Sequence, residues 1–139
     1  MRRRFMASLA QNRVWLTPQD KPKLYETVII FDWDDTILCT SFINPTGTFN
    51  PRQKILPAVM EHLRVLEVCA KKILEMSIAF GKTYIITNAG EGWVQYSAEK
   101  FMPSVVPLLS KIKIISARAQ YEHLYKDYSK WKIHAFLEA

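Results

Sequence analysis

Residues 26–36 read ETVIIFDWDDT, an apolar run that ends abruptly in three carboxylates within four residues. The β-branched run from Val28 to Phe31 is typical of a strand covered on both faces, as in a parallel sheet. Clustered carboxylates repel one another unless a cation or a proton neutralises them, and oxygen ligands of this kind suit Mg²⁺. We therefore predict a buried strand that leads into a metal-binding turn. A polar turn that happens to be acidic is the alternative.

The rest of the chain alternates helical and strand patterns. It predicts a loop over residues 38–50, a helix over 57–80, a strand over 83–87, a helix over 91–101, a helical turn near Pro107, a strand over 113–116 and a helical tail over 119–139, interrupted near 127–129. This alternation of strands and helices forms βαβ units, which predict an α/β fold with right-handed crossovers. We expect a three-layer, Rossmann-like parallel sheet with helices on both faces. Ligands bind such sheets at the carboxyl ends of the strands.

The composition is that of one globular domain, with 49% hydrophobic and 23% charged residues. No apolar run approaches the roughly 20 residues that span a bilayer, so no membrane segment is expected. The net charge of +6 divides unevenly: residues 1–26 hold six basic and two acidic groups, which is +4, and residues 27–139 hold 13 and 11, which is +2. We assign residues 1–25 to a basic N-terminal extension. The core shows no interleaved aromatic and basic surface, so nucleic acid is not expected as a partner.

The two cysteines, Cys39 and Cys69, show neither a CxxC motif nor a disulfide framework. Sparse cysteine usage fits a reducing compartment, and an intracellular, cytoplasmic location is expected. The first 19 residues are rich in arginine and contain no acid, which is also a feature of organelle transit peptides. Targeting by this segment stays open as the alternative.

The acidic turn resembles the first signature of the haloacid dehalogenase (HAD) superfamily, an apolar strand that runs into D-x-D-x-T. The resemblance implies that Asp32 attacks a phosphoryl group and forms an aspartyl-phosphate. It implies that Asp34 serves as acid and base, that Thr36 helps to hold the turn, and that both aspartates bind Mg²⁺. A carboxylate nucleophile, a second carboxylate and a metal would together split a slow hydrolysis into two displacements.

Two further signatures of the family have counterparts. Thr87 ends the second strand, where its hydroxyl would donate to phosphate, and Asn88 and Gly90 follow it as expected substrate-binding residues. Taken alone, Thr87 is as readily a helix N-cap. Lys132 is the expected lysine that offsets the charge of nucleophile and phosphate, with Lys130 as the runner-up. A solvated lysine on a helix face is the alternative for both.

The resemblance covers about residues 27–136, so residues 26–139 are expected to form a partial HAD-like domain. The family's fourth signature, a strand that ends in Gly-Asp or Asp-Asp and completes the metal site, has no counterpart in residues 1–139. The resemblance therefore implies a HAD-like sheet whose C-terminal strands are expected to be missing. Without the missing strand the first strand becomes an uncovered edge, and Mg²⁺ loses a ligand. A truncated sequence, a short form completed by a partner chain and an inactive remnant all fit, and truncation is favoured.

The expected function is that of a Mg²⁺-dependent phosphatase or phosphotransferase, a HAD-type phosphoric monoester hydrolase if the domain is complete. Neither inter-motif segment has room for the family's cap domain, so an open site and a bulky phosphorylated substrate, such as a phosphoprotein or a nucleic-acid end, are expected. A catalytically inactive HAD-like binding module is the main alternative. A phosphoacceptor receiver domain fits less well, because neither later strand ends in a carboxylate.

Overall fold

The computed structural model of the protein describes residues 27–47 and 55–139. The predicted basic extension and part of the predicted loop lie outside this range. The described elements are β1 (Val28–Phe31), α2 (Thr40–Ile43), α3 (Pro57–Phe80), β2 (Lys82–Thr87), α4 (Trp93–Phe101), the 3₁₀ turn η2 (Pro103–Val105), α5 (Val106–Leu109), β3 (Lys113–Ser116), α6 (Ala117–Tyr121) and α7 (Tyr128–Glu138).

The three described strands form one parallel sheet in the order β1-β2-β3. Phe31 pairs with Ile85, and Thr87 pairs with Ser116. All three carboxyl ends therefore lie at the same edge of the sheet, as the βαβ pattern predicts. Within the described part of the chain, β1 and β3 are the two outer strands.

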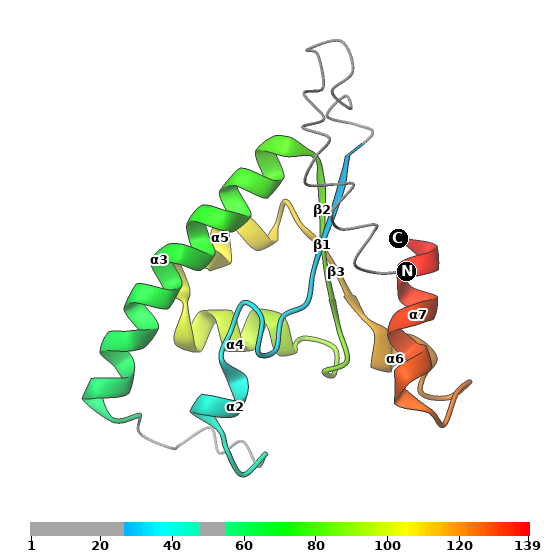
Figure 1. The fold of residues 1–139 in the computed structure, drawn as a ribbon, viewed down its shortest axis with the longest axis horizontal. Coiled ribbons are helices and arrows are strands. Elements are labelled where there is room, and N and C mark those ends of the chain that lie inside the picture. The colour runs from blue at the N-terminus through cyan, green and yellow to red at the C-terminus, as the bar shows by residue number, and fades with distance from the viewer. Residues whose placement is uncertain (1–26, 48–54) are drawn as a thin grey trace, which may run out of the picture.

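Helices cover both faces of the sheet (Figure 1). On one face α3, α4 and α5 bury a core that includes Trp33, Leu74 and Ile85. On the other face α6 and α7 cover a smaller core around Ile86 and Ala135. Because successive residues of a strand point to opposite faces, β2 supplies both cores and is buried from its second residue to its last. The predicted α/β arrangement is confirmed at this level.

Glycine at position 81 allows β1 and β2 to begin side by side. A Cβ atom at Gly81 would overlap the backbone oxygen of Thr27. The N–H of Lys82 donates to that same oxygen over 2.9 Å, which starts the pairing of the two strands. The close approach therefore explains why α3 must end in glycine at this point.

Most element boundaries agree with the sequence patterns. The long helix and the third strand have the predicted bounds. The helical tail is interrupted over residues 122–127, earlier than the predicted 127–129, because the Asp127 side chain caps α7 by accepting from the N–H of Ser129. Differences also occur at α2 and α4. The predicted loop contains the one-turn helix α2, and α4 starts at Trp93 because Gly92, with φ of 80°, turns the chain immediately before it. No helix in residues 27–47 or 55–139 combines the length and apolarity that crossing a membrane requires.

Candidate functional site

The turn that follows β1 is built around Trp33. Its indole is fully buried and donates to the Ser97 hydroxyl over 2.9 Å. Its carbonyl oxygen accepts from the N–H groups of Thr36, Ile37 and Leu38 over 3.4, 2.9 and 3.0 Å. An anchored residue between the two predicted catalytic aspartates fixes where both of them leave the strand.

Asp34 accepts hydrogen bonds from three separate elements. Its Oδ1 accepts from the Thr40 hydroxyl over 2.7 Å and from the Trp93 indole N–H over 2.8 Å. Its Oδ2 accepts from the Thr87 hydroxyl over 3.0 Å. Hydrogen bonds to a carboxylate are stronger than those between neutral groups. The three donors therefore hold the carboxylate in one orientation at the end of the sheet.

Asp32 forms an ion pair with Lys132, the lysine that the sequence analysis preferred. The Nζ atom lies 2.6 Å from Oδ2 of Asp32, and both side chains keep part of their surface exposed, 26% for the lysine and 37% for the aspartate. The other carboxylate oxygen, Oδ1, accepts from the N–H of Trp33 over 2.8 Å. α7 thus brings a positive charge to the end of β1. Lys130 is exposed.

The third carboxylate of the turn is directed elsewhere. Asp35 has a φ of 56°, and its two oxygens accept from the Ser41 N–H over 2.8 Å and the Ser41 hydroxyl over 2.6 Å. These two hydrogen bonds lower the pKa of the Asp35 carboxyl. Thr36 is exposed in the same turn, and its backbone N–H donates to the carbonyl oxygen of Trp33. The contacts of the Asp35 carboxylate with Ser41 therefore hold the start of α2 beside the turn.

The segment after β2 lines an open cleft of about 420 Å³ together with Asp34, Thr40 and Trp93. Asn88 lines this cleft, and its Oδ1 is buried without a hydrogen-bond partner in the described part of the chain. A buried acceptor without a partner can accept a hydrogen bond from a bound ligand or coordinate a cation. Gly90 is exposed and lines the neighbouring hollows instead.

Asp32 and Asp34 are the predicted magnesium ligands. Among residues 27–47 and 55–139, no group of three histidine, cysteine, aspartate or glutamate side chains could hold a metal. Mg²⁺ is commonly held by one or two carboxylates, with waters and substrate phosphate completing an octahedron. Asp32 and Asp34 supply those carboxylates, and the unpartnered oxygen of Asn88 adds a third hard donor at the same strand ends. The donor set therefore fits a magnesium ion shared with a phosphate.

Two residues of this site were missed by the sequence analysis. The sequence patterns assign no role to Trp93, and Thr40 lies within the predicted loop. Neither has a motif spacing relative to Asp34 that could indicate a contact. The contacts arise because the first residues of α4 and of α2 both lie against the turn that follows β1.

The fold and the site together define a parallel α/β protein with two carboxylates, a buried hydroxyl and an ammonium group at the carboxyl end of its sheet. Comparisons with models of protein families, with curated proteins and with solved structures found no match to this chain. The proposal of a function therefore depends on these residues and their geometry.

Proposed function

We propose that this chain is a Mg²⁺-dependent phosphatase or phosphotransferase of the HAD type, which acts through an aspartyl-phosphate on a bulky phosphorylated substrate. The supporting observation is that four residues from three signatures meet at one strand edge. Lys132 lies 2.6 Å from Asp32, and Thr87 lies 3.0 Å from Asp34. Residues so distant in sequence have no reason to converge here if each is merely a turn or surface residue.

In the proposed first step, an oxygen of Asp32 attacks phosphorus, and the bond from phosphorus to the leaving oxygen breaks. The protonated form of Asp34 gives its proton to that oxygen. In the second step, Asp34 takes a proton from water, whose oxygen attacks phosphorus and releases the Asp32 carboxylate with inorganic phosphate. Transfer to another alcohol follows the same course, with the alcohol in place of water.

The neighbouring residues serve this chemistry by position and charge. Lys132 would offset the negative charge that accumulates on Asp32 and the phosphoryl group. The Thr87 hydroxyl, whose single proton is donated to Asp34 in this structure, would turn to donate to a phosphoryl oxygen when phosphate is bound. The Trp93 indole and the Thr40 hydroxyl keep Asp34 oriented. When bound by Asp32 and Asp34, Mg²⁺ would cancel phosphate charge and polarise the phosphoryl oxygens.

The HAD-type arrangement of the sheet and the bulky substrate belong to the same proposal. α2 and α3 are the described elements between β1 and β2, and short helical elements and β3 lie between β2 and α7. None of these described elements forms a separate unit over the cleft at Asp34. A cleft left open in this way suits a phosphate carried on a macromolecule.

Hydrolysis of p-nitrophenyl phosphate, measured with and without Mg²⁺, tests the proposal. Asp32→Asn removes the nucleophile and is expected to lower kcat by about 10³-fold or more. Asp35→Asn is a matched control, since it makes the same change in the same turn but at a carboxylate that faces Ser41. It should stay within a few-fold of wild type. Metal-independent hydrolysis, or equal rates for the two variants, would contradict the assignment.

A non-catalytic binding module is the second candidate, and one observation favours it. Asp35 is directed to Ser41, and of the three carboxylates in the acidic turn only Asp34 lines the described cleft. Binding of orthophosphate that depends on Mg²⁺, without turnover of any phosphomonoester, would support this candidate over the enzyme.

A further inference from the structure

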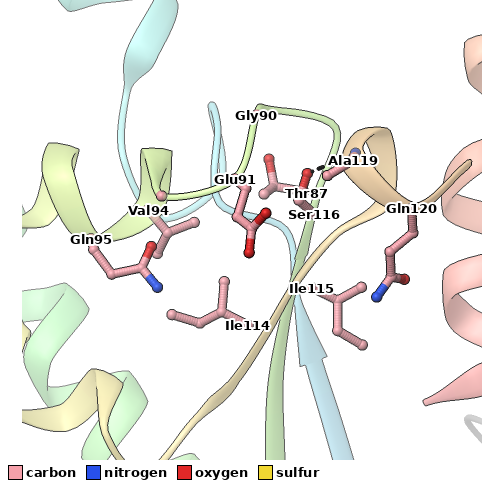
Figure 2. Close-up of a pocket in the computed structure, with 11 residues that line it drawn as sticks. Thr87, Gly90, Glu91, Val94, Gln95, Ile114, Ile115, Ser116, Ala119 and Gln120 are labelled. Carbon is pink, nitrogen blue, oxygen red and sulfur yellow. Dashed lines mark hydrogen bonds between the residues drawn. The ribbon is translucent and has the colours of Figure 1, made fainter. Parts of the chain in front are cut away.

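A second, more enclosed pocket of about 240 Å³ lies beside the outer strand β3 (Figure 2). Its apolar lining comes from the outer edge of β3, where Ile114 lies on the α4 side of the sheet and Ile115 on the α6 side. Glu91 extends into the space from the segment before α4, and the amides of Gln95 and Gln120 flank it from two sides. An apolar edge beside a carboxylate and two amides suits a cation carried on an aliphatic stem.

The charge of this pocket is negative, because Glu91 is its sole ionisable lining residue. Among residues 27–47 and 55–139 no ion pair involves Glu91. Arg118, which lines the adjoining hollow, is instead held by both carboxylate oxygens of Glu122 over 3.1 Å. The carboxylate of Glu91 is therefore available to a cation that arrives from solution.

The pocket adjoins the candidate phosphate site. Thr87 lines it, and the hydroxyl of that residue donates to Asp34. A third hollow links the two: it shares Glu91 with the pocket at β3 and shares Trp93 with the cleft at Asp34. Three adjoining hollows thus surround the β2–α4 segment between Asp34 and Glu91.

We propose that this pocket binds the side chain of a lysine or arginine that neighbours the phosphorylated residue of a phosphopeptide substrate. The inference rests on the proposed function for the phosphate end and on the pocket itself for the basic end. The methylene stem would lie beside Ile114 at the outer edge of β3, and the cationic head would meet Glu91. A nucleic-acid end fits poorly, because its neighbouring groups are anionic phosphates that the same carboxylate repels.

The test uses phosphoserine peptides in which one lysine is moved through the three positions on either side of the phosphoserine. Matched peptides carry norleucine, which has a similar stem and no charge. At one position, kcat/KM of the wild-type protein should favour lysine by roughly two- to five-fold, the range of an exposed ion pair. Glu91→Gln should reduce this ratio to about one. Glu99→Gln removes the same charge from the exposed surface of α4 and should leave the ratio unchanged.

Failure of the inference differs from failure of the proposed function. Hydrolysis that depends on Asp32 but is indifferent to lysine at every position would overturn the inference alone. Hydrolysis of p-nitrophenyl phosphate that depends on Asp32, without hydrolysis of any peptide, would likewise overturn the inference alone. If neither p-nitrophenyl phosphate nor any peptide is hydrolysed, the proposed function fails, and amide NMR shifts on addition of acetyl-lysine methylamide test the pocket by itself. Shifts around Glu91 and β3 that acetyl-norleucine methylamide does not cause, and that Glu91→Gln abolishes, support it. Equal shifts for both ligands, or none, overturn it.

Discussion

Replacing Thr87 by valine tests the centre of the site, because valine keeps the shape of threonine and removes only its hydroxyl. Thr87 is 1% exposed. Its hydroxyl donates to Asp34 over 3.0 Å and accepts from the N–H of Ala89 over 2.9 Å. The substitution therefore leaves one carboxylate oxygen and one backbone N–H without these partners.

The magnitude follows from those two contacts. A hydrogen bond to a charged group is worth about 1.5–3 kcal/mol. The bond from Ala89 adds about 1 kcal/mol at most, and less here because Ala89 is only partly buried and water can replace the lost acceptor. We expect Thr87→Val to lower the free energy of unfolding by about 2–3 kcal/mol. Activity should fall by about 10²-fold, since a donor to phosphate and one tether of Asp34 are lost together.

Thr87→Ser is the matched control. It keeps the hydroxyl and removes one buried methyl group, which costs about 1 kcal/mol. Urea unfolding and p-nitrophenyl phosphate kinetics on the same preparations separate the two effects. Serine should lose stability but keep activity within a few-fold, whereas valine should lose both. If valine keeps wild-type activity, or if serine is as inactive as valine, the role of the hydroxyl is refuted.

Three further predictions follow from other contacts. Lys132→Met should lower kcat by about 10²-fold, because the positive charge paired with Asp32 is lost. Lys130→Met, at an exposed lysine of the same helix, should keep a kcat near that of the wild type. Comparable losses of kcat in both variants would argue against a role for the Lys132–Asp32 ion pair. Iodoacetamide near neutral pH should modify the exposed Cys69 before Cys39, because burial raises the pKa of the Cys39 thiol and less of its thiolate forms. Mass spectrometry over a time course of the reaction gives the order of modification. Gly81→Ala should destabilise the fold by about 1–3 kcal/mol in urea unfolding, because the new methyl overlaps the backbone just before β1; a neutral effect would contradict that close approach.

The succession of elements was predictable because its signals are local. The apolar stripe of α3, its first-turn proline and its terminal glycine predict both ends of that helix. The apolar run of β3 has the predicted bounds for the same reason. The short helix α2 was not predictable, because it depends on contacts of Ser41 with the carboxylate of Asp35 rather than on periodicity.

The sequence by itself determined that acidic residues end one apolar strand and a threonine ends the next, and parallel pairing then brings them to a common edge. The burial expected for the first strand is wrong, because β1 is an outer strand of the described sheet with Val28 half exposed. Tertiary structure alone decided which other groups join the aspartates and the threonine. The indole of Trp93 reaches Asp34 across 59 positions of the chain. Lys132 was expected from the resemblance, and the structure adds its contact with Asp32. Such contacts depend on how helices pack against the sheet, and packing between distant elements leaves no spacing in the sequence that could reveal it.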